Sequence, residues 1–251
     1  MPKPLIIAHR GASCDAPENT AAAVRLAWEG GADAVEVDVR LSLDGQAMVI
    51  HDADTGRVAG VARPVCAQTA AELRALDAGV WKGSSWAGER IPLLSEILPL
   101  RPPEGRMVLE IKSGPGTLPV VARALDDAHV PPEAAEIITF DIETARQART
   151  LWPQRRILGL AAVSRERWGA PPEEWLEPFL VLARELRLDG LDLGVFPGLD
   201  GDAVRRVKTH GLSLYVWTVN DAATARRLAE AGVDGITTDR AALLRREWNG
   251  G

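Results

Sequence analysis

Two carboxylates, Glu36 and Asp38, stand two residues apart in an apolar run that extends from Ala34 to Val39. In an extended strand, side chains two residues apart point to the same face, so both carboxylates would be directed at one place. Like charges held close together in an apolar setting repel one another unless a cation or hydrogen-bond donors compensate for them. The pattern therefore predicts a binding or catalytic site at this strand.

The elements that must position these carboxylates are short β-rich runs that alternate with amphipathic helical stretches. Residues 47–50 follow the turn dipeptide Asp44-Gly45, and we expect them to pair with the preceding strand as a hairpin. The remaining runs predict eight parallel strands, the number that closes a (β/α)8 TIM barrel. An open doubly wound sheet is the alternative, but no glycine-rich phosphate fingerprint follows the first strand. The expected strands are 5–8, 34–39, 107–111, 136–139, 156–161, 190–193, 213–219 and 235–237.

The chain of 251 residues, of which 46% are hydrophobic, is long enough to bury one large core. No stretch resembles a linker, so we expect a single domain over residues 1–251. One long interruption separates the second and third strands. We expect a small inserted cap segment, at about residues 55–91, because loops that follow barrel strands gather at the C-terminal end.

The overall charge and the cysteine content restrict the partners of the protein. The formal net charge is −6 and there is no long basic run, which argues against a nucleic-acid partner. No stretch approaches the length of a membrane-spanning helix, so we expect no stable membrane insertion. Cys14 and Cys66 are too few for a disulfide framework and fit a cytoplasmic location. Nothing in the sequence indicates an oligomeric state.

A TIM barrel builds its active site at the C-terminal ends of its strands, so polar residues at those positions should converge. This position-based set includes two of the four histidines. Its members are His9 and Arg10 after the first strand, Glu36 and Asp38 on the second, His51 on the hairpin, Glu110 and Lys112 on the third, and Trp217 and Asn220 after the seventh.

The order and spacing of these residues resemble the motifs of the glycerophosphodiester phosphodiesterase family. Each motif alone has little specificity, whereas the whole series extends across the chain. The matching motifs are His9-Arg10-Gly11-Ala12, Ala16-Pro17-Glu18-Asn19-Thr20, Glu36-x-Asp38-Val39, His51-Asp52, Glu110-Ile111-Lys112, Thr139-Phe140-Asp141, Trp217-Thr218-Val219-Asn220 and Gly235-Ile236-Thr237-Thr238-Asp239.

The resemblance implies a (β/α)8 barrel that hydrolyses small-molecule glycerophosphodiesters to glycerol 3-phosphate and an alcohol, in lipid and glycerol metabolism. It also implies a divalent metal ion. Carried over residue by residue, the implied roles are metal ligand for Glu36, Asp38 and Glu110, catalytic proton transfer for His9 and His51, and substrate binding for Arg10, Lys112 and Trp217.

The chemistry of phosphodiester hydrolysis explains why these residue types are needed. Three carboxylates offer hard oxygen ligands that suit Mg²⁺ or Ca²⁺, and the sequence does not separate the two. The cation and the basic pair Arg10 and Lys112 would neutralise the charge of the phosphodiester. One histidine would protonate the leaving alcohol while the other accepts a proton from the attacking hydroxyl. Direct attack by water and prior attack by a glycerol hydroxyl, which gives a cyclic phosphate, both stay open.

Several assignments have a purely structural alternative. Arg10 and Lys112 could be counter-ions of the carboxylates that never touch substrate, and Trp217 could belong to the core. Glu18 and Asn19 fit either loop fastening and helix capping or a direct role.

Two other functions compete with hydrolysis of glycerophosphodiesters. One is a barrel that binds phosphodiesters without catalysis, and the other is a phosphodiesterase acting on lysophospholipids. The second would need an apolar groove or a basic amphipathic helix for membranes, and we find no such helix. The chain departs from the usual family pattern at Cys14-Asp15 and after His51-Asp52, which leaves the substrate range open. We expect Trp81 and Trp86 of the cap segment to cover the alcohol head group.

Overall fold

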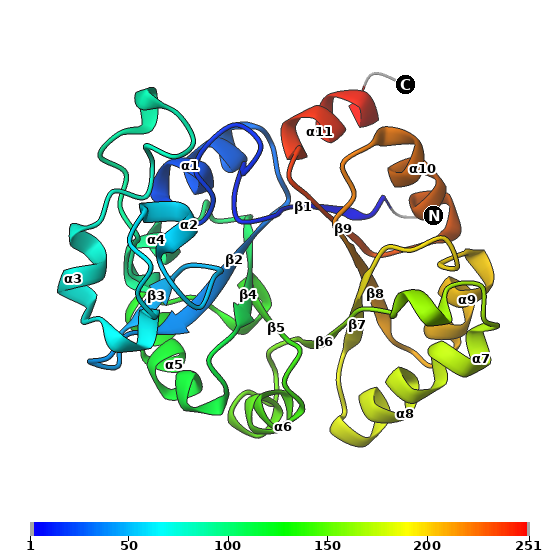
Figure 1. Ribbon diagram of the computed structural model, residues 1–251. Coiled ribbons are helices and arrows are strands. Elements are labelled where there is room, and N and C mark those ends of the chain that lie inside the picture. The colour runs from blue at the N-terminus through cyan, green and yellow to red at the C-terminus, as the bar shows by residue number, and fades with distance from the viewer. Residues whose placement is uncertain (1–2, 250–251) are drawn as a thin grey trace.

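Eight parallel strands form a closed barrel in the computed structural model, which describes residues 3–249. The first strand pairs with both the last strand and the second, which closes the ring. Helices surround the strands on the outside (Figure 1). The (β/α)8 prediction is therefore confirmed. The barrel strands are β1 (Leu5–Ala8), β2 (Ala34–Leu41), β4 (Arg106–Ile111), β5 (Ala135–Thr139), β6 (Ile157–Ala161), β7 (Gly190–Gly194), β8 (Ser213–Trp217) and β9 (Gly235–Thr238).

The remaining strand, β3 (Ala47–Val49), forms the predicted hairpin with β2. The two strands are antiparallel, and Gly45 in the turn between them has a φ of 73°, a conformation that favours glycine. The backbone N–H of Ile50 donates to the carbonyl oxygen of Asp38 at 3.0 Å. The hairpin therefore brings the residue after Ile50, His51, back to the strand that carries the paired carboxylates.

The helices on the outside of the barrel bury one apolar face against the strands. Helix α1 begins after Thr20, whose hydroxyl caps it by accepting from the backbone N–H of Ala23 at 3.2 Å. Thr20 is therefore the N-cap residue, and Asn19 is not. The helices that follow barrel strands are α1 (Ala21–Glu29), α5 (Leu118–Asp127), α6 (Ile142–Leu151), α8 (Glu177–Leu186), α9 (Gly201–Thr209), α10 (Ala222–Ala231) and α11 (Ala241–Asn249).

Prolines interrupt the helical structure of two segments, residues 94–100 and 172–186. Helix α4 (Leu94–Ile97) gives way to a 3₁₀ turn that contains Pro99. Helix α7 (Pro172–Trp175) is separated from α8, which has Pro178 in its first turn. Proline has no N–H to donate to the preceding helical turn, but its fixed φ suits the start of a new segment.

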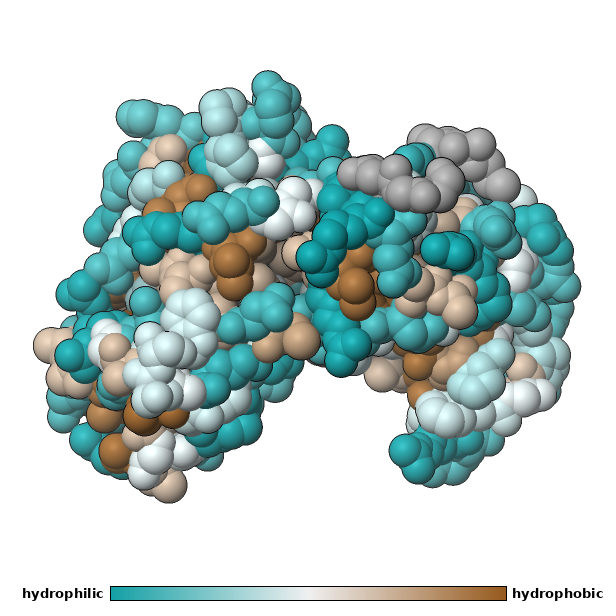
Figure 2. All heavy atoms as spheres, turned by 90° about the horizontal axis from the view of Figure 1, so that it is seen from above, coloured by the Kyte–Doolittle hydropathy of each residue, from teal (hydrophilic) through white to brown (hydrophobic). Residues whose placement is uncertain are grey.

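The cap segment, residues 55–91, lies between β3 and β4 and packs beside the barrel through its own apolar cluster. It contains α2 (Gly56–Ala59) and α3 (Ala70–Ala75), and Thr69 and Glu72 form a capping box at the start of α3. Seen from above, a broad notch separates the half of the molecule with the cap segment from the half with α7 to α10 (Figure 2). The largest cluster members are Met48, Ile50, Leu73 and Ile91.

Acidic side chains are buried among the apolar ones along the β-strands of the barrel. Side chains of several barrel strands, which include Ile7, Ile138 and Tyr215, pack together in one apolar cluster. Within the described residues, no helix has the length and apolar character needed to cross a membrane. The buried acidic residues are Glu36 and Asp38 on β2, Glu136 on β5 and Asp192 on β7.

Candidate active site

Three carboxylates gather where β2 and β4 end. Asp38 lies opposite Glu110 in the parallel register of the two strands, and Glu36 points to the same side as Asp38. Glu36, Asp38 and Glu110 each offer an oxygen atom within 4.8 Å of the others. The Oε1 atom of Glu36 is buried and has no hydrogen-bond partner among the described residues. The convergence predicted from the sequence is therefore observed, and one oxygen of the cluster still lacks a compensating group.

Burial and mutual repulsion shape the charge of this cluster. Burial raises the pKa of Glu36 well above its usual range, and the neighbouring Asp38 and Glu110 raise it further. Burial and Asp38 likewise raise the pKa of Glu110. Burial also disfavours the charged form of Asp38, but Lys112 and Arg10 outweigh it and hold the pKa of Asp38 below its usual range. Additional positive charge at the cluster would favour the ionised forms of Glu36 and Glu110.

The two basic residues are tied to the carboxylates. Lys112 Nζ lies 2.6 Å from Glu110 Oε1 and 3.2 Å from Asp38 Oδ1. Arg10 Nε lies 3.3 Å from Asp38 Oδ2, and the Arg10 backbone N–H donates to Glu36 Oε2 at 2.8 Å. Arg10 has a φ of 56°, an uncommon conformation for a residue with a side chain. These contacts fit the counter-ion interpretation, and binding of phosphate by either residue stays a prediction.

Asn19 fastens the loop after β1 to the carboxylate cluster. Its Nδ2 donates to Asp38 Oδ2 at 2.7 Å, and its Oδ1 accepts from the Asp38 backbone N–H at 3.1 Å. Its side chain is buried and Thr20 caps the helix, so Asn19 orients a carboxylate of the cluster. The sequence left its role open between capping and a direct part in the site.

His9 is held by an acidic residue from the opposite end of the chain. Its Nδ1 lies 2.7 Å from Asp239 Oδ1, in the loop after β9. Asp239 also accepts from Ser13 Oγ at 3.0 Å and from Asn220 Nδ2 at 2.6 Å. Burial works against the charged form of Asp239, but these hydrogen bonds, with that of His9 the largest, lower its pKa to about 2. Asp239 is therefore an ionised partner that fixes the His9 ring.

His51 has an equivalent partner next to it in the sequence. Its Nδ1 lies 2.7 Å from Asp52 Oδ1, and Arg57 Nε donates to Asp52 Oδ2 at 2.6 Å. Despite burial, Arg57 and His51 lower the pKa of Asp52 to about 2. Burial lowers the pKa of His51, although Asp38 and Asp52 oppose the shift.

Arg57 of α2 also joins the cap segment to the loop after β1. Its Nη1 and Nη2 donate to the two oxygens of Glu18, both at 2.8 Å, and Glu18 Oε1 accepts from Arg10 Nη1 at 2.8 Å. A continuous chain of charged hydrogen bonds therefore runs from Arg10 through Glu18, Arg57 and Asp52 to His51.

A small cavity of about 90 Å³ opens at the C-terminal ends of the strands, between the two histidines. Trp217 lines it, packs edge-on against Phe140 with ring centroids 5.9 Å apart, and donates from Nε1 to the Asp192 carbonyl at 3.2 Å. Trp81 and Trp86 do not line this cavity. Their contact with a head group therefore stays a prediction. The predicted site residues that line the cavity are His9, Arg10, Glu36, His51, Glu110, Lys112 and Trp217.

Three residues of this end of the barrel were not assigned a role from the sequence. Asp239 follows the last strand, and its position at a strand end was the signal that could have identified it. Asp192 interrupts the apolar strand β7, as Glu36 and Asp38 interrupt β2. Its buried Oδ1 has no hydrogen-bond partner in the part of the chain that the structure describes. Burial raises the pKa of Asp192 well above its usual range. Arg57 lies in the cap segment, where no pattern in the sequence pointed to it.

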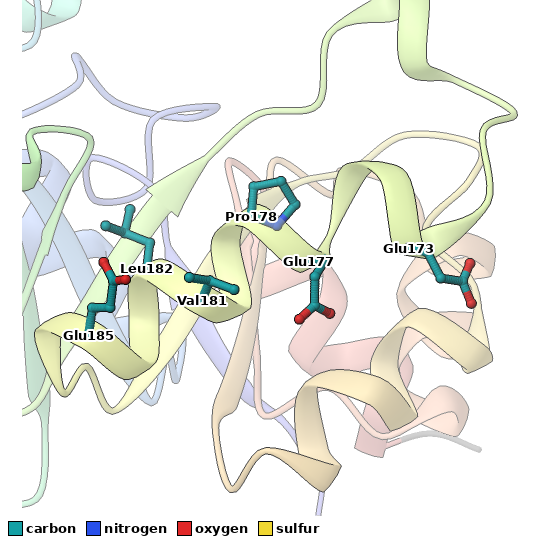
Figure 3. A pocket seen from close by; sticks show the side chains of 6 residues that line it. All are labelled: Glu173, Glu177, Pro178, Val181, Leu182 and Glu185. Atoms are coloured by element: carbon teal, nitrogen blue, oxygen red, sulfur yellow. The ribbon is translucent and has the colours of Figure 1, made fainter.

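An open hollow of about 630 Å³ lies elsewhere, on the outer surface of α7 and α8 (Figure 3). None of the predicted site residues lines it, and its polar groups are carboxylates without a basic or histidine neighbour in its lining. The predicted site residues therefore gather at the smaller cavity at the strand ends and away from this hollow. The residues that line the outer hollow are Glu173, Glu177, Pro178, Val181, Leu182 and Glu185.

Comparison with known proteins gives the same class as the fold and the site, a barrel enzyme of the phosphodiesterase type. The profile of the Glycerophosphoryl diester phosphodiesterase family matches residues 9–243. The glycerophosphodiester phosphodiesterase of Caldanaerobacter subterraneus is 35% identical over 243 residues, which cover 94% of each chain.

Solved structures agree with the sequence comparison. A phosphodiesterase of Oleispira antarctica, solved in complex with its product sn-glycerol-3-phosphate, superposes with a TM-score of 0.85 at 30% identity and covers 98% of this chain and 97% of its own. A glycerophosphodiester phosphodiesterase of Agrobacterium tumefaciens superposes with a TM-score of 0.77 at 26% identity, with coverage of 97% and 99%. The chain belongs to the glycerophosphodiester phosphodiesterase family and is an enzyme of that class.

Proposed function

We propose that the protein hydrolyses small glycerophosphodiesters to glycerol 3-phosphate and an alcohol, with a divalent metal ion and two catalytic histidines. The observation that carries this proposal is the cluster of Glu36, Asp38 and Glu110 beside one cavity that two carboxylate-bound histidines also line. The product bound in the Oleispira antarctica structure supports the choice of substrate class.

The carboxylate cluster fits a divalent cation. Glu36 Oε1 is buried without a hydrogen-bond partner, and a cation would supply the missing compensation. Glu36, Asp38 and Glu110 would hold the ion, and a set of hard oxygen ligands suits Mg²⁺ or Ca²⁺. When bound, such an ion neutralises charge on the phosphodiester and favours attack at phosphorus.

The two histidines are arranged for opposite proton transfers. In each ring Nδ1 is bonded to a carboxylate, which leaves Nε2 free to exchange a proton with a reacting group. The lowered pKa of His51 favours its neutral form, so we assign His51 the role of accepting the proton from the attacking hydroxyl. His9 then protonates the leaving alcohol. The same division serves direct attack by water and attack by a glycerol hydroxyl.

The remaining residues of the cavity would bind the substrate. Arg10 and Lys112 would contact the phosphate oxygens from the positions in which the carboxylates hold them. Trp217 would line the side of the cavity that takes the glycerol, with Phe140 against its ring.

We further propose that residues 1–251 act as a single domain, in which the cap segment completes the site through Arg57. The free cysteines Cys14 and Cys66 fit a cytoplasmic location.

Incubation of the purified protein with glycerophosphocholine tests the proposal. We expect release of glycerol 3-phosphate, its loss in excess chelator, and its recovery on addition of Mg²⁺ or Ca²⁺. Glu36→Gln should abolish the recovery, whereas Glu133→Gln, at an exposed position outside the cavity, should leave it intact.

Each alternative function gives its own result in this assay. Binding of glycerophosphocholine without turnover would identify a non-catalytic barrel. Turnover of lysophosphatidylcholine in place of glycerophosphocholine would identify a lysophospholipid phosphodiesterase. Full activity in chelator would contradict the metal requirement.

A further inference from the structure

The end of the barrel opposite the candidate active site contains a hollow of about 860 Å³. It lies at the N-terminal ends of the strands, because its lining includes the first residues of β1, β4 and β8. Its volume falls within the range of about 300–1,000 Å³ that is usual for small-molecule sites. None of the residues assigned to catalysis or substrate binding lines it.

Basic side chains dominate the lining of this hollow, although the protein as a whole has a formal net charge of −6. Asp234 is the acidic residue of the lining, and it is paired with Lys208 at 2.6 Å. The basic residues come from separate segments that the barrel brings together, and they are Lys3, Arg106, Arg156, Arg205 and Lys208.

The floor of the hollow holds two of the guanidinium groups in place. The buried Glu136 accepts from the Tyr215 hydroxyl at 3.1 Å, and its Oε1 lies 3.3 Å from Arg156 Nε and 3.7 Å from Arg106 Nη1. Arg156 Nη2 also donates to Ser213 Oγ at 2.9 Å. One carboxylate cannot neutralise two guanidinium groups, so positive charge remains at the floor.

The other partners do not remove the surplus of positive charge. Arg205 pairs with Asp202 on the exposed face of α9, and Lys208 pairs with Asp234. Lys3 has no carboxylate partner among the described residues. Asp189 also acts on Arg156, but it is itself paired with Arg149. With this pair included, six cationic side chains meet four carboxylates in and around this hollow.

We propose that this hollow is a second ligand site, which binds a small anion that carries a phosphate group. The guanidinium groups of Arg106 and Arg156 match the geometry of phosphate oxygens, and Lys3, whose Nζ lies 3.5 Å from the Trp248 carbonyl oxygen, adds a further positive charge. Leu5 and Val233 form an apolar part of the wall that would contact the carbon portion of a phosphate monoester. The site is separate from the catalytic cavity, so its occupation does not depend on the proposed hydrolysis.

Methyl NMR of the full chain, without added metal, locates the binding directly. Inorganic phosphate and sn-glycerol 3-phosphate are titrated separately, and the methyl signals of Leu5 and Val233 report on the hollow, while those of Ile138 and Leu160 report on the catalytic cavity. We expect saturable shifts at Leu5 and Val233. Equal affinity for both probes would show recognition of the phosphate group alone, and preference for the ester would show that the carbon portion also binds.

Two variants and a matched control decide the result. Arg106→Gln leaves the closer Arg156 to pair with Glu136 and should weaken binding at Leu5 and Val233 about tenfold. The double variant Lys3→Glu with Arg205→Glu leaves Glu136 and its two arginine partners unchanged. It should also weaken binding of the anion. The control, Arg146→Glu with Arg184→Glu, reverses two exposed charges outside the hollow. It should change the affinity at the hollow less than twofold. Leu5 and Val233 signals that do not shift in the wild type would overturn the proposal. Equal affinity in the wild type and in both variants of the hollow would also overturn it.

Discussion

The two sides of the catalytic cavity carry the same histidine–carboxylate pair on different supports. His9 and His51 each lie 2.7 Å from an aspartate oxygen. Asp239, the partner of His9, is held by neutral donors from the barrel loops, Ser13 and Asn220. Asp52, the partner of His51, is held by a guanidinium group from the cap segment. Side chains of the barrel loops therefore hold the His9 pair, where the cap segment contributes only the contact of Lys82 Nζ with the Ser13 carbonyl oxygen at 2.6 Å, and the hairpin with the cap segment holds the His51 pair.

This difference indicates that the cap segment supports the proposed site through Arg57. Arg57 bonds to Asp52 and to Glu18, and Glu18 bonds to Arg10. A change in the cap segment therefore reaches both His51 and a proposed phosphate-binding residue. A comparable change beside Asp239 reaches His9 through the Asp239 carboxylate.

Removal of either histidine should have the largest effect and should affect both sides equally. His9→Ala and His51→Ala should each lower kcat on glycerophosphocholine about 10²–10⁴-fold, because each removes one proton transfer. The control is His129→Ala, an exposed residue outside the cavity, which should retain wild-type kcat. A variant of one side that keeps full activity would confine proton transfer to the other.

Removal of the carboxylate partner should come next in size. Asp239→Asn and Asp52→Asn preserve shape but remove the charge that fixes each ring, and we expect losses in kcat of about 10–100-fold. Steady-state kinetics measures both. Similar losses would show that the two supports position their histidines equally well, and an unaffected Asp239→Asn would contradict the equivalence of the pairs.

Loss of the outer support should separate the two sides. Arg57→Gln should lower kcat about tenfold, because Asp52 and Glu18 both lose a charged partner, whereas Asn220→Ala should cost less. Arg57→Lys should recover part of the loss, since it restores the charge without the bidentate contact. Thermal unfolding of each variant serves as the control for folding. Equal effects of Arg57→Gln and Asn220→Ala would remove the distinction between barrel and cap supports.

The smallest effect should appear in stability at acid pH. The pKa values of Asp52 and Asp239 are both about 2 in the folded protein, below the usual unfolded value of about 3.9. Each carboxylate therefore stabilises the fold above about pH 4, and this contribution is lost as the pH falls toward 2. Urea unfolding should show a smaller loss of stability over this interval in Asp52→Asn and Asp239→Asn than in wild type. Asp127→Asn, on the exposed surface of α5, is the matched control.

The sequence was sufficient for the barrel and for the centre of the site. Strand alternation predicted the eight strands, and the period of two placed Glu36 and Asp38 on one side of β2. The short turn at Asp44-Gly45 identified the hairpin that returns His51 to the site. Local pattern and barrel geometry are enough for such residues, because each lies on a barrel strand or directly after the hairpin strand.

The contacts that support the site could not be predicted from the same signals, although Asp239 itself lies at a strand end. Arg57 reaches Asp52 and Glu18 only through the folded path of the cap segment, where it lies on the short helix α2. The pairing of His9 with Asp239 joins the two ends of the chain and depends on closure of the barrel. Neither contact leaves a pattern of spacing in the sequence.

The pH dependence of kcat/KM on glycerophosphocholine tests the central claim, that the two histidines divide proton acceptance and proton donation. We expect a bell-shaped profile in wild type, because one ring must be neutral and the other protonated. His51→Ala should lose the acidic limb and His9→Ala the alkaline limb. Bell-shaped profiles equal to wild type in both variants would contradict the account.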